Sequence, residues 1–205
     1  MLIKICGINS VENARAIAAL NISHLGMIFY EKSPRKVTFD QLPMVESKRV
    51  GVFVNEELSV IEETINTHQL DVVQLHGQET MEEVLIIQAL GVEVWKAIPI
   101  SNANDFAICE RYSAPLDAFL FDTKGKHAGG NGTSFNWELL DAYTSELPFI
   151  VSGGIQASHA PSLKSLRKKH SNMIGVDLNS GFESIPGVKN VDQVAQFVNE
   201  IRENE

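Results

Sequence analysis

The chain has 205 residues and a net charge of −9, so it is long enough for one domain, or two small ones, with a buried core. The negative charge argues against a nucleic-acid-binding surface, which needs a basic stripe, but leaves room for an anionic small molecule held by a few local donors. The two cysteines lie far apart without a zinc-binding pattern, the N-terminus lacks a signal peptide and no apolar stretch approaches the ~18 residues of a membrane span, so we expect a cytoplasmic protein with free thiols.

Apolar, β-branched runs alternate with helical patterns along the whole chain. The first run, Leu2 to Cys6, is typical of a strand, and a helix over residues 11–20 is predicted to follow it, with Asn9 or Ser10 as its cap. Further strands are predicted at residues 24–29, 49–54, 72–76, 94–98, 118–122, 149–152 and 173–177. Helices are predicted at residues 59–68, 81–90 and 191–201, with a short one near 40–46.

Eight such strand–helix units predict an α/β fold, a compact (β/α)8 TIM barrel with about 26 residues per unit. No linker rich in Ser, Pro or Gly divides the chain, so we expect a single barrel domain over residues 1–205. A doubly wound open sheet is the alternative, because it gives the same alternation if two of the predicted strands do not form. Both folds place their sites at the carboxyl ends of the strands.

Polar or ionisable residues close five of the predicted strands, each after an apolar run. They are Cys6, His76, Asp122, Ser152 and Asp177. Because alternate residues of a barrel strand face inward, these side chains are expected to point to one cavity. The sequence therefore predicts a thiol, an imidazole and two carboxyl groups in the same place.

A thiol and a carboxyl group across one cavity suit proton transfer, in which one group removes a proton from carbon and the other delivers one to oxygen. Lys4 shares a strand face with Cys6, and a nearby cation stabilises a thiolate. Asp122 follows three apolar residues, and such a dry setting favours the protonated acid. The alternatives are a buried hydrophobic thiol for Cys6, a cap or turn role for the aspartates and a backbone-bonded core histidine for His76.

Two glycine-bearing turns follow the seventh and eighth strands. Gly153-Gly154 and Ser180-Gly181 lie where such barrels bind phosphate, because glycine lets backbone N–H groups approach an anion. After the second strand, Arg35 is a candidate for pairing with a carboxylate, with a solvated run of charges as the alternative. The glycine-rich segment Lys124 to Phe135 is typical of a mobile lid or of a plain surface loop.

Short motifs at these strand ends follow one another in a specific order along the whole chain. They are Lys4-Ile5-Cys6-Gly7-Ile8, Phe29-Tyr30 with Lys32-Ser33 and Arg35, Val50-Gly51-Val52-Phe53-Val54-Asn55, Val73-Gln74-Leu75-His76-Gly77, Phe121-Asp122-Thr123, Gly129-Gly130-Asn131-Gly132 with Phe135 and Trp137, Ser152-Gly153-Gly154, and Val176-Asp177 with Ser180-Gly181. In this order and spacing the sequence resembles the phosphoribosylanthranilate isomerase family of tryptophan biosynthesis. It departs from that family's pattern at Asn9, where threonine is usual, and at Leu178-Asn179, where a valine or isoleucine and a serine are expected.

The resemblance implies a (β/α)8 barrel that needs neither a metal nor an organic cofactor. It also implies an Amadori rearrangement of N-(5'-phosphoribosyl)anthranilate to the corresponding 1-deoxyribulose 5-phosphate. By position, Cys6 would be the general base at C2' and Asp122 the general acid at the furanose ring oxygen, while Asp177 would assist near the sugar hydroxyls or the Schiff-base nitrogen. Arg35 would hold the anthranilate carboxylate and the two glycine turns the phosphate, and His76 is counted among the substrate-binding residues.

Two other functions are kept as alternatives. One is a non-catalytic barrel that binds phosphosugars, although Cys6 and Asp122 argue against it. The other is a different barrel enzyme, such as a phosphosugar epimerase, which would normally need metal ligands or paired carboxylates at the strand ends. For the leading hypothesis we expect a small-molecule substrate, no nucleic-acid or membrane partner, and a monomer or homodimer.

Overall fold

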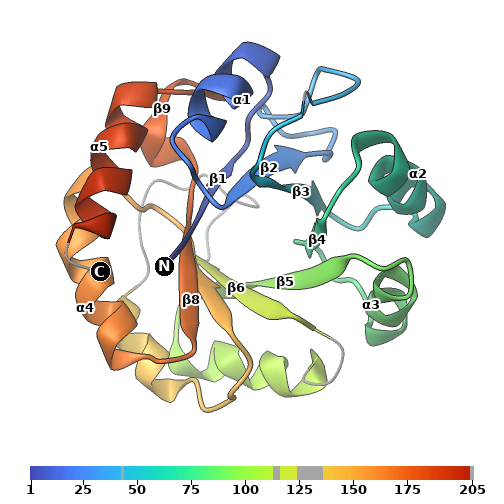
Figure 1. Cartoon of the computed structure of the whole chain (residues 1–205). Helices are drawn as coiled ribbons and strands as arrows, with labels where there is room; N and C mark the ends of the chain where they lie inside the picture. Colours follow the sequence, from blue (N-terminus) through green and yellow to red (C-terminus); the bar gives the residue numbers. More distant parts are fainter. Residues whose placement is uncertain (43, 113–115, 124–135, 204–205) are drawn as a thin grey trace.

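Strand β1, Leu2–Cys6, pairs with a strand on each side, and this pairing closes the sheet into a barrel (Figure 1). The computed structural model describes residues 1–42, 44–112, 116–123 and 136–203. The other barrel strands are β2 (His24–Ile28), β3 (Lys48–Phe53), β4 (Val72–Leu75), β5 (Glu93–Ile100), β6 (Ala118–Thr123), β7 (Phe149–Val151) and β8 (Met173–Leu178). Since neighbouring strands are parallel all the way round, the predicted (β/α)8 barrel is confirmed and the open doubly wound sheet is wrong.

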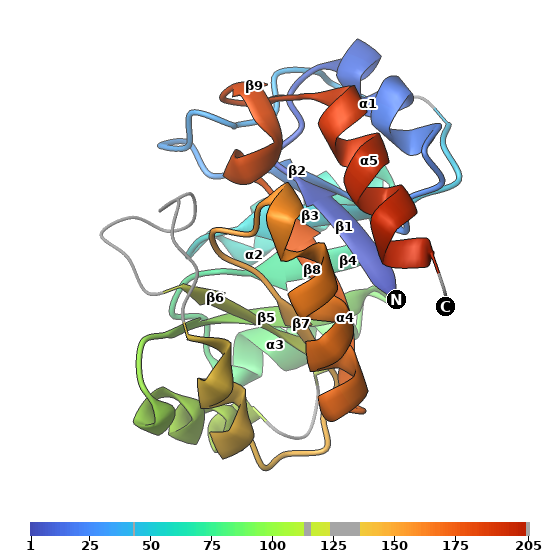
Figure 2. The same ribbon diagram turned by 90° about the vertical axis from the view of Figure 1, so that its left-hand side faces the viewer.

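Helices surround the barrel, as Figures 1 and 2 show. The α-helices are α1 (Val11–Ala18), α2 (Leu58–His68), α3 (Met81–Gln88), α4 (Ala160–Lys169) and α5 (Val191–Arg202), and the 3-10 helices are η1 (Ala103–Tyr112), η2 (Trp137–Ala142), η3 (Ala157–His159) and η4 (Ser180–Phe182). Ser10, rather than Asn9, caps α1 by accepting a hydrogen bond from the backbone of Asn13. In the described part of the chain, every helix is too short or too polar to cross a membrane.

The connection between β2 and β3 has no helix among its described residues, so the short helix predicted near residues 40–46 is wrong. The chain first stays beside β2, where Lys36 forms a bridge with Ile28 and Val37 N donates to Ile28 O at 2.9 Å. Val37 and Leu42 are both buried. This irregular segment therefore covers the core without the side-chain periodicity of a helix.

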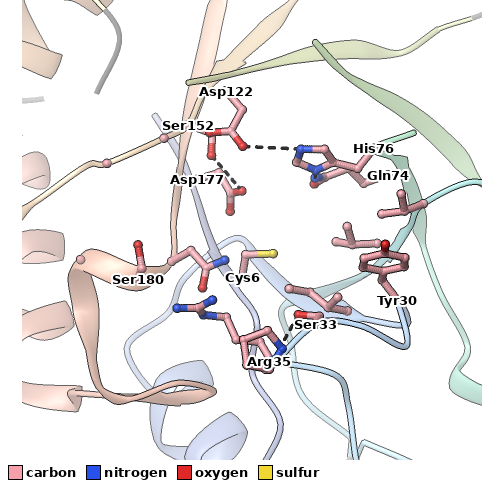
Figure 3. Close-up of a pocket in the computed structure, with 18 of the residues that line it drawn as sticks. Cys6, Tyr30, Ser33, Arg35, Gln74, His76, Asp122, Ser152, Asp177 and Ser180 are labelled. Carbon is pink, nitrogen blue, oxygen red and sulfur yellow. Dashed lines mark hydrogen bonds and ion pairs between the residues drawn. The ribbon is translucent and has the colours of Figure 1, made fainter. Parts of the chain in front are cut away.

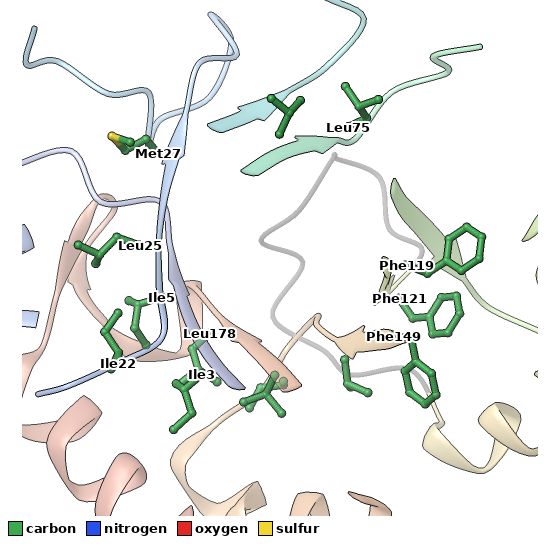
Figure 4. Close-up of a cluster of buried hydrophobic side chains, with 14 of the residues drawn as sticks. Ile3, Ile5, Ile22, Leu25, Met27, Leu75, Phe119, Phe121, Phe149 and Leu178 are labelled. Atoms are coloured by element: carbon green, nitrogen blue, oxygen red, sulfur yellow. The ribbon is translucent and has the colours of Figure 1, made fainter. Parts of the chain in front are cut away.

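Side chains of the barrel strands alternate between two apolar layers. On β1, Ile3 and Ile5 face the outer layer between barrel and helices, part of which Figure 4 shows. The barrel interior holds a separate cluster of seven buried residues, namely Val50, Val72, Trp95, Ala97, Ala118, Leu120 and Ile150. Lys4 and Cys6 occupy the other face of β1 from Ile3 and Ile5, as the alternation predicted. The fold therefore directs polar side chains of the strands toward the axis of the barrel.

Candidate active site

A cavity of about 610 Å³ lies at the carboxyl ends of the barrel strands. All the predicted site residues line it, namely Cys6, Arg35, His76, Asp122, Gly153, Gly154, Asp177, Ser180 and Gly181. Figure 3 shows Asp177 lying between Asp122 and Cys6 on one side of this cavity. The predicted lid, residues 124–135, lies outside the described residues.

Cys6 ends β1, with Lys4 two residues before it on the same face. Gly26 is the register partner of Cys6, and a Cβ at that position would lie 2.9 Å from Cys6 Sγ and 3.1 Å from Lys4 Cε. Only glycine therefore leaves room for both side chains. Burial raises the pKa of the Cys6 thiol, and the Lys4 ammonium partly opposes this rise. The predicted effect of Lys4 on the thiolate is present, but burial outweighs it.

Asp177 connects Lys4 to the cavity. Lys4 Nζ donates to Asp177 Oδ1 at 2.9 Å, and Ser152 Oγ donates to Asp177 Oδ2 at 3.4 Å. Burial alone would lower the pKa of Lys4, but the charges of Asp177 and Cys6 raise it above its ordinary value. Lys4 is therefore a fixed, fully buried cation beneath the thiol.

Asp122 lies in β6 and is almost completely buried. Its Oδ1 accepts a hydrogen bond from Thr123 N at 2.8 Å, and its Oδ2 lies 3.5 Å from His76 Nε2. On the other side of the imidazole, Gln74 Nε2 lies 3.4 Å from His76 Nδ1. With Gln74 as donor to Nδ1, the ring proton of neutral His76 is on Nε2 and faces Asp122. Gln74 thus holds the imidazole against the Asp122 carboxyl group.

The turns after β7 and β8 bring bare backbone to the cavity. Gly153 and Gly154 have φ angles of 83° and 62°, which favour glycine. A Cβ at Gly153 would lie 2.5 Å from Thr123 N, and a Cβ at Gly181 would lie 2.2 Å from Ile155 O. Both turns therefore need glycine, and they have the exposed backbone that anion-binding turns use.

Arg35 lines the cavity but is paired with a carboxylate that the sequence analysis did not consider. Its Nε donates to Glu183 Oε1 at 2.9 Å and Oε2 at 3.0 Å, and its Nη2 donates to Oε2 at 2.8 Å. Glu183 begins β9 (Glu183–Ile185), which forms a hairpin with β10 (Val188–Lys189) after β8. Arg35 thus reaches the cavity as one half of an ion pair with Glu183, a partner that the sequence did not indicate.

Sequence reasoning missed two residues behind the cavity, Glu183 and Lys189. Gln74 lies two residues before His76 and lines the cavity with it, as the alternation of strand side chains predicts. Lys189 gave no signal, since its strand has two residues and shows no periodicity.

The cavity combines a thiol, a carboxyl group held by an imidazole, an arginine and two turns of bare backbone. This arrangement can move protons on a small anionic molecule, with donors for negative groups at one side. Among the described residues, no group of three or more His, Cys, Asp or Glu side chains is placed to hold a metal ion.

Comparison with known proteins shows to which family a chain with this site belongs. The family described as "N-(5'phosphoribosyl)anthranilate (PRA) isomerase" matches residues 3–200. The N-(5'-phosphoribosyl)anthranilate isomerase of Parabacteroides distasonis is 41% identical over 98% of this chain and 93% of its own. The phosphoribosyl anthranilate isomerase of Thermotoga maritima superposes with a TM-score of 0.82 at 31% identity, covering 99% of this chain and 100% of its own. Another solved phosphoribosyl anthranilate isomerase, in complex with reduced 1-(o-carboxyphenylamino)-1-deoxyribulose 5-phosphate, superposes with a TM-score of 0.81 at 30% identity over 99% and 100% of the two chains. The chain therefore belongs to the N-(5'-phosphoribosyl)anthranilate isomerase family, the aldose–ketose isomerases of tryptophan biosynthesis.

Proposed function

We propose that this protein carries out the family's reaction by general acid–base catalysis, with Asp122 as the acid and Cys6 as the base. The substrate would be N-(5'-phosphoribosyl)anthranilate and the product 1-(2-carboxyphenylamino)-1-deoxyribulose 5-phosphate. The observation that carries the proposal is that a buried thiol on β1 and a buried carboxyl group on β6 line the same cavity.

The first step would be protonation of the furanose ring oxygen by Asp122. The C1'–O bond then breaks, and the nitrogen lone pair forms a Schiff base with C1'. The contact with His76 supports the position this role requires, because the imidazole restrains the carboxyl group at the cavity wall. His76 would thus contribute to substrate binding indirectly, by holding Asp122 at the wall of the cavity.

The second step would be removal of the C2' proton by the Cys6 thiolate. The electrons of the C–H bond form the C1'–C2' double bond of an enolamine, which tautomerises to the ketose, so the reaction needs no oxidant. The cationic Lys4 beneath Cys6 supports this role in part, because its charge opposes the rise that burial causes in the pKa of the thiol. Asp177, between the acid and the base, would assist near the sugar hydroxyls or the Schiff-base nitrogen.

The cavity would bind the substrate at both of its charged ends, the phosphate and the anthranilate carboxylate. The turns with Gly153, Gly154, Ser180 and Gly181 would hold the phosphate, because bare backbone N–H groups suit an anion. Arg35 would hold the anthranilate carboxylate with the part of its guanidinium that Glu183 does not occupy. The reaction as written uses no cofactor.

We also infer that the chain acts as one barrel domain over residues 1–205, in the cytoplasm, as a monomer or homodimer. The closed barrel formed by strands β1 to β8 supports one domain. Free, buried cysteines agree with a reducing compartment.

The proposed roles predict that Cys6→Ser and Asp122→Asn each lower kcat by ~10² to 10⁴, because general acid or base groups typically contribute that much. Binding of the substrate should persist, since neither change removes the phosphate turns or Arg35. The measurement is the decay of anthranilate fluorescence with freshly generated substrate, with the product identified by mass spectrometry and NMR.

Cys109→Ser is the matched control, because this second buried thiol lies in η1 and its pKa is raised to about 12 by burial. Its activity should remain near that of the wild type. Full activity of Cys6→Ser or Asp122→Asn would remove that residue from the mechanism. Binding without turnover in the wild type would instead favour the non-catalytic phosphosugar-binding barrel.

A further inference from the structure

A buried group of three charges lies behind the Arg35 side of the cavity. Glu183 and Lys189 are register partners in the β9–β10 hairpin, and Lys189 Nζ donates to Glu183 Oε1 at 2.6 Å. The same carboxylate accepts the hydrogen bonds of Arg35. The Lys189 side chain is 0% exposed, Glu183 5% and Arg35 14%, so only the arginine reaches the cavity.

Lys189 is fixed at both its backbone and its ammonium. Its backbone exchanges two hydrogen bonds with the Asn13 side chain of α1, at 2.8 and 2.9 Å. Its Nζ donates to Asn179 Oδ1 at 2.7 Å, and the Asn179 side chain lines the cavity. The fold therefore fixes this buried ammonium in place through contacts with three elements, unlike the ammonium of a surface lysine.

The number of charges decides what Arg35 can attract. A guanidinium paired in two places with one carboxylate is neutral as a unit, and a neutral unit attracts a second carboxylate only weakly. Lys189 adds a second positive charge to the same carboxylate, which leaves one net positive charge. Burial opposes ionisation of both Glu183 and Lys189, and it lowers the pKa of Lys189, an effect that the Glu183 charge partly offsets. Arg35 and Lys189 bring the pKa of Glu183 below its ordinary value, and Lys189 Nζ donates to the oxygens of Glu183 and Asn179, the arrangement of an ammonium beside a carboxylate.

The geometry leaves part of the guanidinium for a ligand. Glu183 occupies the edge formed by Nε and Nη2, and within the described residues no hydrogen bond engages Nη1. The Arg35 stem also lies against Gly7, where a Cβ would come within 2.8 Å of Arg35 Cδ. The arginine is therefore restrained by its stem and by one edge, with the other end directed to the cavity it lines (Figure 3).

We propose that Lys189 is a positioning residue for substrate recognition: its ammonium offsets the charge of Glu183, so that Glu183 can orient Arg35 without cancelling the attraction of Arg35 for an aromatic carboxylate. The inference rests on the proposed role of Arg35 toward the anthranilate carboxylate and adds the buried residues that make this role effective. Glu183 orients, Lys189 restores the charge, and Arg35 alone contacts the ligand.

The test compares two ligands that differ in one group. One is reduced 1-(o-carboxyphenylamino)-1-deoxyribulose 5-phosphate, and the other is the same compound without its carboxylate. The ratio of their Kd values, measured by titration calorimetry, isolates the contribution of the carboxylate, because the phosphate is common to both. We expect the wild type to prefer the carboxylate, and Lys189→Met to reduce this preference by a factor on the order of 10 or more, the typical effect of a charged hydrogen bond.

The double variant Glu183→Gln/Lys189→Met separates charge from structure. It leaves Arg35 with one net positive charge, so the preference for the carboxylate should return toward that of the wild type. A purely structural role of Lys189 would not be rescued by removing the charge of its partner. Lys96→Met is the control for loss of a buried, ion-paired lysine, because Lys96 pairs with Glu79 and neither residue lines the cavity.

Three results would overturn the inference. An unchanged preference in a folded Lys189→Met protein, checked by circular dichroism, would show that its charge is irrelevant to recognition. An equal loss of affinity for both ligands in Lys189→Met, with no recovery of affinity in the double variant, would show that Lys189 only stabilises the structure of the hairpin. A wild type with no preference would overturn the role of Arg35 as well, and so the two proposals fail in distinguishable ways.

Discussion

At the scale of single residues, the state of Cys6 is decided by its neighbours from three strands. Lys4 lies on its own strand, Asp177 on β8 and Lys189 on β10. Burial raises the pKa of the thiol, Asp177 adds to this rise, and the two ammonium groups oppose it. The sequence predicted the contribution of Lys4, because residues two apart on a strand share a face. It placed Asp177 in the same cavity without predicting its effect on the thiol, and it gave no indication of Lys189, whose strand has only two residues.

Removal of the Lys4 charge should raise the pKa of Cys6 further. We expect Lys4→Met to move the midpoint of thiol alkylation upward by ~1 pH unit or more, as for the loss of an opposite charge a few ångströms away. The measurement is the rate of reaction with iodoacetamide against pH, without substrate, in a Cys109→Ala background. A midpoint equal to that of the parent would exclude Lys4 as the counter-charge of the thiolate, and Lys96→Met again controls for loss of a buried lysine.

At the scale of elements, the barrel strands were predictable and the connections were less so. The predicted strand 2–6 has the observed bounds, because apolar β-branched runs with a polar end have few other interpretations in such a chain. The link between β2 and β3 was wrongly predicted, because Val37 and Leu42 are buried by an irregular segment that follows β2. The β9–β10 hairpin was missed for a related reason, since strands of two and three residues have no detectable period.

Helix α3 illustrates a local signal that can be tested alone. Thr80 and Glu83 form a reciprocal capping box, in which Thr80 Oγ1 accepts from Glu83 N and Glu83 Oε2 accepts from Thr80 N. Thr80→Ala should lower the free energy of unfolding by ~1 kcal/mol, as for other lost N-caps. Urea unfolding gives the value. Thr64→Ala, in the half-buried middle of α2 and away from its N-cap, should change stability little, and an equal loss there would refute the capping explanation.

At the scale of the whole molecule, the buried His24 in the barrel interior couples stability to pH. His24 on β2 is buried and contacts Trp95, with ring centroids 5.0 Å apart and the rings tilted by 52°. Neither of its ring nitrogens has a hydrogen-bond partner among the described residues. Burial and the nearby Lys4 ammonium lower its pKa from 6.5 to about 4. The unfolded chain therefore takes up a proton on this residue at a higher pH than the folded protein does.

His24 should consequently stabilise the fold above pH 6.5 and lose this contribution as the pH falls toward about 4. The difference between the two pKa values corresponds to ~3 kcal/mol. The free energy of unfolding, measured in urea at pH 7 and pH 4.5, should thus fall by less in His24→Leu than in the wild type. Parallel losses in the two proteins would show that His24 does not contribute to the acid sensitivity of the barrel.

The candidate site as a whole could be anticipated only in part from the sequence. Cys6, Asp122 and Asp177 were found because each ends a strand of one barrel, and a barrel brings strand ends together. The ion pairs behind them were not found, because pairing of Lys4 with Asp177 or of Arg35 with Glu183 depends on contacts between residues more than a hundred positions apart. Such contacts leave no local pattern in the chain.

The pairing of β1 with β8 has a consequence for how the enzyme is made. Cys6 leaves the ribosome well before Asp177 and Lys189, which set its surroundings. A nascent chain therefore holds this thiol without a finished cavity until β8 and β10 have been made. Chains truncated before β8 would lack the complete site, so the site forms only when β1 pairs with β8.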